Sequence, residues 1–123
     1  MVDTHRVERL LARSTRFARR WFTPDEVEQC LGVNGPAQAY AQRLAAKEAV
    51  WKALGLDDWT GGVPWLHIGT SHGVAGFTVE LTGSVAEACA DIALGRIHVA
   101  VEHSAGRTFA LAVVEGATRG SLA

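Results

Sequence analysis

Long apolar runs and cysteines are scarce in this sequence. It has no stretch of 18 apolar residues, so we expect no transmembrane helix. Its N-terminus also lacks the apolar segment of a secretory signal. The only cysteines, Cys30 and Cys89, are too few for a disulfide framework. They predict free thiols in a reducing compartment, the cytoplasm, with a single bridge between them as the open alternative.

The chain is long enough for one domain with its own core. It has 123 residues, of which 48% are hydrophobic. We expect a single domain over residues 1–115 and a flexible tail over 116–123. The net charge is −1, but it is unevenly distributed. Residues 1–20 hold six arginines against Asp3 and Glu8, which gives +4, whereas the remainder has six basic and eleven acidic residues, which gives −5.

A basic segment on an acidic body predicts an anionic partner, which could be nucleic acid, a membrane surface or a protein. Nucleic acid is disfavoured because the chain as a whole is not basic and has no aromatic residues interleaved with the arginines. A membrane is disfavoured because the core is expected to use the apolar side of this segment, including Phe17 and Trp21. The acidic surface of another protein fits best.

The hydrophobic spacing predicts helices in the first half of the chain. Apolar residues at steps of three and four indicate a helix from about Val7 to Trp21, broken at most once. Thr23-Pro24-Asp25-Glu26 has the pattern of a capping box and begins a short helix that ends near Leu31. The longest helix is expected over residues 37–54, which are rich in helix formers, and Gly55 ends it.

The second half alternates in the manner of strands. Ser84 through Glu87 resembles another capping box and predicts a helix to about Leu94. Together with the long helix, the strands predict an α+β domain in which an antiparallel sheet packs against that helix. Strands are expected at residues 2–5, Val63–Gly69, Gly76–Thr82, Ile97–Glu102 and Thr108–Val114.

The long helix places a carboxylate beside its most apolar stripe. On a helical wheel Glu48 lies about 40° from Leu44. A carboxylate in this position needs a cation, a metal ion or access to water. An ion pair with Lys52, four residues later, is one explanation, and a ligand role is the other.

Three further residues could carry function. Arg43 and Lys47 lie about 40° apart on the neighbouring helix face, where they would form either a solvated surface or a basic ledge for phosphate. His103 stands where a strand meets a turn, a position that suits either the rim of a site or an ordinary surface histidine. No set of histidines and cysteines has the spacing of a zinc site.

The run Arg43–Gly55 resembles the signature helix of the holo-acyl-carrier-protein synthases, R-F-A-A-K-E-A-x-x-K-A-x-G. Other segments resemble further patterns of that family in the same order, over the chain to about Val114. These further segments are Val2-Asp3 with Val7-Glu8-Arg9, Arg16-Phe17 through Glu26, and Ile97 through His103. The resemblance implies a phosphopantetheinyl transferase fold.

The resemblance also implies roles for individual residues. It makes Asp3 and Glu48 ligands of a magnesium ion whose remaining ligands are substrate phosphates and water. It makes Arg9, Arg16 and Arg20 the docking residues for an acidic carrier protein. The residues implied to bind coenzyme A are Arg43, Lys47, Lys52 and His103, and those implied to act in catalysis are Glu48, Lys52 and His103.

The implied reaction is phosphoryl transfer in a cytoplasmic homotrimer, with the coenzyme A site between neighbouring subunits. A serine hydroxyl of an acyl or peptidyl carrier protein attacks the β-phosphorus of coenzyme A and releases adenosine 3',5'-bisphosphate. His103 would orient or deprotonate that serine. The sequence departs from the family at Arg6, at Ala100 and at Gly73-Val74-Ala75. These departures leave an alternative, a catalytically impaired homologue that binds a carrier without modifying it.

Overall fold

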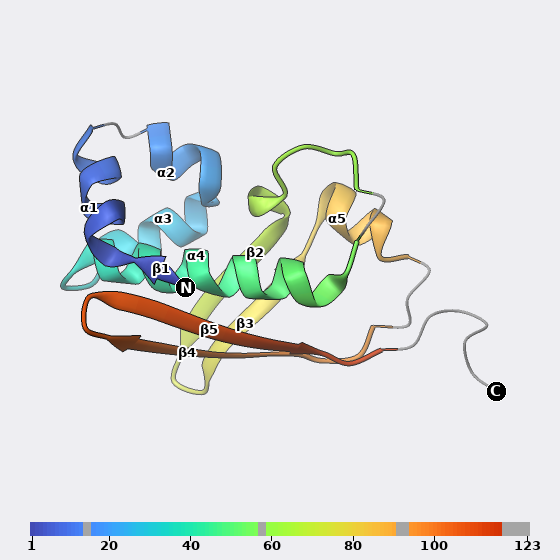
Figure 1. Cartoon of the computed structure of the whole chain (residues 1–123). Coiled ribbons are helices and arrows are strands. Elements are labelled where there is room, and N and C mark those ends of the chain that lie inside the picture. The colour runs from blue at the N-terminus through green and yellow to red at the C-terminus, as the bar shows by residue number, and fades with distance from the viewer. Residues whose placement is uncertain (14–15, 57–58, 91–93, 117–123) are drawn as a thin grey trace.

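The computed structural model describes residues 1–13, 16–56, 59–90 and 94–116. Helices α1 to α3 lie together at one end of the molecule, and α4 runs through its middle. The β4–β5 hairpin runs along α4 (Figure 1). The elements are, in chain order, β1 (Val2–Asp3), α1 (Thr4–Arg13), α2 (Arg16–Trp21), α3 (Pro24–Leu31), α4 (Pro36–Leu54), the 3-10 turn η1 (Trp65–His67), β2 (Ile68–Gly73), β3 (Gly76–Leu81), α5 (Gly83–Ala88), β4 (Ile97–Ser104) and β5 (Arg107–Val114).

The strands form two antiparallel sheets, whereas the sequence predicted one. The larger has the order β1-β5-β4, and the smaller consists of β2 and β3. The β4–β5 turn uses Ala105 and Gly106 at φ values of 52° and 74°, the left-handed geometry that suits a two-residue hairpin. The strand predicted at Val63–Gly69 was placed too early, because Trp65–His67 forms a 3-10 turn and pairing begins at Ile68.

Helix α4 is the central element of the domain and confirms the longest predicted helix. Pro36 occupies its first turn, and Gly55 ends it in the left-handed conformation at φ 61°. The helix contacts α1 and α3 as well as β1, β2, β4 and β5. Two hydrophobic clusters follow its length, one around Tyr40 and Leu44 and the other around Val50 and Leu54. Because α4 is enclosed by other elements, its charged side chains are not automatically solvated.

The shorter helices α3 and α5 test the two capping boxes that were predicted from the sequence. Helix α3 confirms the predicted capping box, with reciprocal bonds between Thr23 and Glu26. The predicted box at Ser84 was wrong, since Thr82 precedes α5, makes no side-chain cap and ties its backbone N–H to the carbonyl of His67. Helix α5 also ends at Ala88, well before the expected end.

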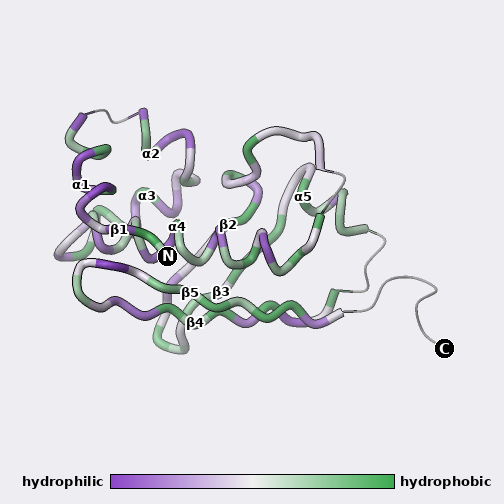
Figure 2. The backbone as a smooth tube through the Cα atoms, viewed as in Figure 1, coloured by the Kyte–Doolittle hydropathy of each residue, from purple (hydrophilic) through white to green (hydrophobic). Residues whose placement is uncertain are grey.

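The N-terminal segment begins its helix earlier than predicted. Strand β1 ends at Asp3 and α1 starts at once with Thr4, whereas the spacing of apolar residues indicated a start near Val7. The backbone over α1 and α2 is mainly hydrophilic, and hydropathy alternates along the β4–β5 hairpin (Figure 2). Within the predicted 7–21 helix, α1 is described to Arg13 and α2 from Arg16. Residues 14–15 lie outside the described part of the chain, as does most of the predicted tail, residues 117–123.

Two sequence-based expectations concern membranes and thiols. Among the described residues, no helix combines the length and apolarity needed to cross a membrane. Cys30 and Cys89 are both buried and free, so the alternative of a bridge between them is wrong.

Candidate functional site

The structure brings Asp3 and Glu48 to the walls of one pocket. Asp3 comes from the end of β1, and Glu48 from the middle of α4. The pocket has a volume of about 550 Å³ and is largely apolar apart from these two carboxylates and Arg6. Its other walls are Met1, Val2, Val7, Leu10, Phe17, Trp21 and Leu44. Two acidic groups, 45 residues apart in the sequence, therefore share one cavity.

Asp3 caps the first helix and remains exposed. Its Oδ1 accepts the backbone N–H of His5 at 2.9 Å and that of Arg6 at 3.3 Å. Such bonds stabilise the ionised form. The N–H of Arg6 is the main cause that lowers the pKa of Asp3 below its ordinary 3.8, with His5 and Arg9 acting in the same direction. Asp3 is therefore charged at neutral pH, and its Oδ2 has no partner among the described residues.

Glu48 is half-buried on α4. The ion pair with Lys52 that could have explained this carboxylate does not form, since no ion pair within the described segments joins the two residues. Lys52 is instead exposed one turn further along the helix. A carboxylate without a cationic partner beside an apolar pocket is a candidate ligand.

The donor set of the pocket fits a magnesium ion. Asp3 and Glu48 are hard oxygen ligands, and Mg²⁺ commonly uses one or two protein carboxylates, with water and substrate phosphates as the remaining ligands. Within the described residues no group of three or more histidine, cysteine or acidic side chains could hold a metal. The site is therefore too sparse for a metal held by protein alone and suits one that is shared with an anionic substrate.

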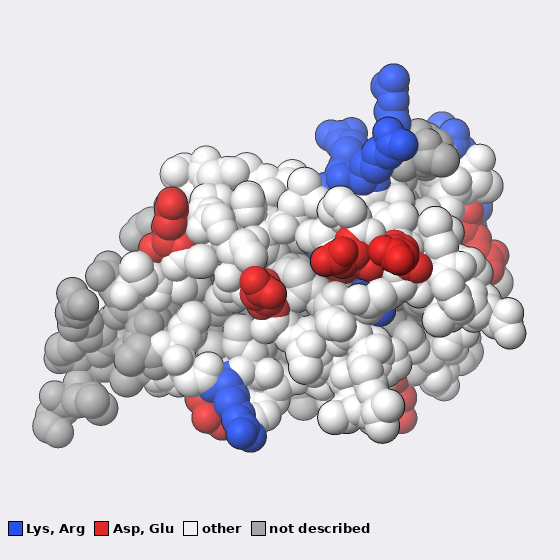
Figure 3. Space-filling view, turned by 180° about the vertical axis from the view of Figure 1, so that it is seen from behind, with Lys and Arg blue, Asp and Glu red and all other residues white. Residues whose placement is uncertain are grey.

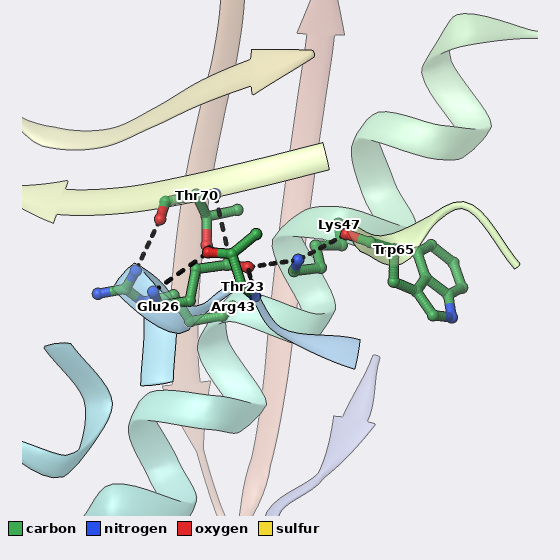
Figure 4. Close-up of polar contacts among 6 residues, drawn as sticks. All are labelled: Thr23, Glu26, Arg43, Lys47, Trp65 and Thr70. Atoms are coloured by element: carbon green, nitrogen blue, oxygen red, sulfur yellow. Dashed lines mark hydrogen bonds and ion pairs between the residues drawn. The ribbon is translucent and has the colours of Figure 1, made fainter. Parts of the chain in front are cut away.

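Arg43 and Lys47 lie inside the protein, so the expectation of a solvated helix face is wrong. Arg43 is 5% exposed and Lys47 is 0% exposed. The Lys47 Nζ donates to Glu26 Oε1 and to the carbonyl of Trp65, both at 2.7 Å. The Arg43 guanidinium donates to the carbonyl of Thr70 at 2.9 Å (Figure 4). It also donates to Gln29 Oε1 at 2.8 Å.

Burial lowers the pKa of Lys47, while the neighbouring Glu26 carboxylate opposes this shift by favouring the charged lysine. Neither Arg43 nor Lys47 lines the pocket of Asp3 and Glu48. Direct contact between Lys47 and a phosphate would require the lysine to leave its present partners.

His103 is half-buried near the end of β4. It is paired in the sheet with Thr108 of β5, and its Nδ1 lies 3.0 Å from Thr108 Oγ1. Thr108 is also paired with Val2 of β1, so the row of residues that holds His103 continues into the strand that carries Asp3. Neither His103 nor Lys52 lines the pocket that Asp3 and Glu48 share.

The arginines of α1 and α2 form an exposed basic surface. Basic side chains gather at this end of the molecule, above a group of acidic ones, in the rear view (Figure 3). Arg6 also lines the pocket, which was not predicted from the sequence. Its position three residues after Asp3, at the start of a helix, is the signal that could have revealed this. The exposed arginines are Arg6, Arg9, Arg13, Arg16, Arg19 and Arg20.

Residues 1–113 match the family model described as the 4'-phosphopantetheinyl transferase superfamily. A holo-[acyl-carrier-protein] synthase from Anaeromyxobacter sp. (strain K) is 36% identical over 120 residues, which cover 94% of this chain and 91% of the relative. The crystal structure of this synthase from Neisseria meningitidis matches with a TM-score of 0.78 and 26% identity, over 93% of this chain and 92% of the other. The Helicobacter pylori synthase in complex with coenzyme A has a similar fold, with a TM-score of 0.73, 24% identity, and coverage of 93% and 95%.

Proposed function

Because the chain belongs to the 4'-phosphopantetheinyl transferase superfamily, among its holo-[acyl-carrier-protein] synthases, we propose that Asp3 and Glu48 hold a magnesium ion against its substrate. The chain transfers phosphopantetheine from coenzyme A to a carrier protein. The observation that carries the proposed site is the single pocket shared by the two carboxylates. When bound there, the ion would neutralise charge that develops on the pyrophosphate.

Lys52 and His103 have separate roles in the proposed phosphoryl transfer. Lys52, exposed one turn after Glu48, supplies a mobile ammonium to the phosphates of coenzyme A. The serine oxygen of the carrier forms a bond to the β-phosphorus, and the bond from that phosphorus to the adenosine 3',5'-bisphosphate breaks. We assign to His103 the orientation of the serine or the acceptance of its proton. The contact of Nδ1 with Thr108 supports this role, because it leaves Nε2 available.

We propose that the carrier docks on the arginines of α1 and α2, with Arg9, Arg16 and Arg20 as its main contacts. All three are exposed on the end of the molecule that also contains the pocket. Basic side chains attract an acidic partner and orient it before close contact forms. The placement supports a carrier whose serine enters beside Asp3 and Glu48.

We further propose a homotrimer built on the outer face of β5. Phe109, Leu111 and Val113 alternate along this strand and are 45%, 68% and 53% exposed. A row of large apolar side chains on a solvent-facing strand is typical of an association surface. Trimer formation would place the coenzyme A site between subunits. It would also allow Lys52 and His103, which lie outside the pocket of one chain, to contribute to a shared site.

The proposal extends to domain organisation and location. We propose one domain over residues 1–115, because the family match ends at residue 113 and β5 ends at Val114. The buried free thiols of Cys30 and Cys89 support a reducing location, the cytoplasm.

A carrier-loading assay tests the proposed function. Purified chain, coenzyme A and an apo carrier protein are incubated with and without Mg²⁺, and the mass of the carrier is measured. We expect the mass of one phosphopantetheine to be added only with Mg²⁺, and Glu48→Ala to abolish loading. Failure to load any of several acyl and peptidyl carriers, although they bind in an arginine-dependent way, would favour the impaired homologue instead.

A further inference from the structure

The most enclosed charged groups in the described part of the chain are Glu26 and Lys47. Their side chains are 1% and 0% exposed, and Lys47 Nζ lies 2.7 Å from Glu26 Oε1. Charges in such a position are costly to bury, so a buried pair is weak evidence for stability. Such a pair can instead restrict how the elements that carry it are arranged. The proposed mechanism gives neither of these two residues a role.

The Glu26 carboxylate is a junction between several elements (Figure 4). On one oxygen it accepts the backbone N–H of Thr23 at 2.9 Å as well as the Lys47 ammonium. On the other it accepts the Thr70 backbone N–H at 3.1 Å and a hydrogen bond from the Thr70 hydroxyl. Lys47 then continues to the carbonyl of Trp65. The pair thus ties α4 to α3, β2 and η1 at once.

Arg43 provides a second anchor one turn earlier on α4. Its two terminal nitrogens donate to the carbonyl of Thr70 and to Gln29 of α3. Arg43 and Lys47 therefore both bind α3, at positions four residues apart on α4. Arg43 also bonds to β2, and Lys47 also bonds to η1. Two anchors separated along one helix face fix both the rotation and the axial position of that helix.

The position of α4 decides where Glu48 points. Glu48 follows Lys47 directly, about 100° further around the helix, and lines the pocket with Asp3. Trp65, whose carbonyl accepts from Lys47, also stacks on Trp21 of the pocket wall, with ring centroids 5.8 Å apart. The polar cluster is thus linked to the pocket through α4 and through this aromatic pair.

We propose that Glu26 is a positioning residue for the metal site, acting through Lys47 to set the approach of Glu48 to Asp3. This inference rests on the proposed function and deepens it. Placement errors near 1 Å can cost about 100-fold in rate. The expected effect of disturbing Glu26 is therefore weaker cation binding, with a smaller change in the affinity for coenzyme A, since Glu26 itself is enclosed and cannot touch that substrate.

Two substitutions test the inference in the full chain. Glu26→Gln keeps the shape and removes the charge that holds Lys47. Thr70→Val removes one hydroxyl donor to Glu26 and leaves the ion pair. Glu28→Gln, at an exposed position on the same helix, is the matched control. Folding is checked by circular dichroism, cation binding by a Mn²⁺ titration followed by electron paramagnetic resonance with coenzyme A present, and loading by the half-saturating Mg²⁺ concentration and the KM for coenzyme A.

We expect Glu26→Gln to raise the Mn²⁺ dissociation constant and the half-saturating Mg²⁺ concentration about tenfold or more, with less than about threefold change in KM. Thr70→Val should move the same two quantities by about threefold, and Glu28→Gln neither. Cation binding by folded Glu26→Gln equal to that of the unmodified chain, or an equal loss of cation and coenzyme A binding, would overturn the inference. If Glu26→Gln does not fold, Thr70→Val decides by the same criteria. Failure of the unmodified chain to load a carrier would count against the proposed function alone, since Mn²⁺ binding is measured without turnover.

Discussion

Asp3 combines a structural and a chemical role in one side chain. Its Oδ1 caps α1 through the N–H groups of His5 and Arg6. The same bonds keep the carboxylate ionised, which a metal ligand must be. The first helical turn thus helps to prepare Asp3 as a ligand without burying it.

We expect the pKa of Asp3 to be below its ordinary 3.8 in the folded chain. Because the folded-state pKa is lowered, the ionised form favours folding, and this contribution is complete above the unfolded pKa and lost as pH falls through the folded one. A carbon-detected NMR titration of the side-chain carboxyl measures it, with Asp3→Asn to assign the signal. A midpoint at or above 3.8 would contradict the role of the capping bonds.

Cys30 illustrates a residue whose chemistry is suppressed by burial. Desolvation is the main cause that raises its pKa to about 11, so the thiol is neutral at physiological pH. The neutral thiol favours folding below its ordinary pKa of 9.0, and this contribution is lost as pH rises toward 11. We expect the native chain to react with a disulfide reagent at pH 8 at least about tenfold more slowly than the denatured chain. Equal rates would show that the thiol is accessible and the core incorrectly assigned.

Local signals predicted helices well where the side chains act on neighbouring residues. The capping box of α3 formed as expected because Thr23 and Glu26 need only each other. The similar pattern at Ser84 failed because a tertiary bond, from the Thr82 N–H to the carbonyl of His67, governs the start of α5. Sequence alone contains the first kind of information and lacks the second.

This difference predicts unequal effects of two similar substitutions. Thr23→Ala should lower the free energy of unfolding by about 1 kcal/mol, because it removes the bond to the Glu26 N–H. Ser84→Ala should change it by less than about 0.5 kcal/mol, since Ser84 caps no helix here. Urea denaturation of both variants provides the measurement. A loss at Ser84 equal to that at Thr23 would show that the caps are wrongly assigned.

Helix α4 marks the limit of the helical wheel. The wheel correctly placed Glu48 beside the apolar stripe of Tyr40 and Leu44, both of which are buried. The wheel could not show whether Arg43 and Lys47 are solvated or enclosed, because it contains no information on which elements cover their face of the helix. The buried partners, Glu26 and Thr70, come from elements that only the tertiary fold brings there.

At the scale of the whole molecule, the pairing of Asp3 with Glu48 could be predicted only through the family resemblance. Nothing in their spacing of 45 residues implies a common pocket, which depends on β1 and α1 lying against α4. The second, smaller sheet was likewise not expected, since alternation identifies strands without fixing their partners.

The outer face of β5 leads to a prediction about assembly. We expect Leu111→Glu to shift the chain from trimer toward monomer, because a charge would be buried at an apolar contact. Val74→Glu, at an exposed hairpin residue, is the matched control and should leave the assembly unchanged. Light scattering coupled to size-exclusion chromatography measures the mass. An unchanged trimer for Leu111→Glu, or a monomer for the unmodified chain, would rule out this surface.

The central claim is that Asp3 and Glu48 bind one divalent ion, which the phosphates of coenzyme A also bind. A crystal structure of the chain with coenzyme A and Mg²⁺ tests it most directly. We predict one ion that is bound by an oxygen of each carboxylate at about 2.0–2.1 Å, with phosphate oxygens and water completing an octahedron. Bound coenzyme A with its pyrophosphate away from this pocket, and the two carboxylates without a shared ion, would contradict the account.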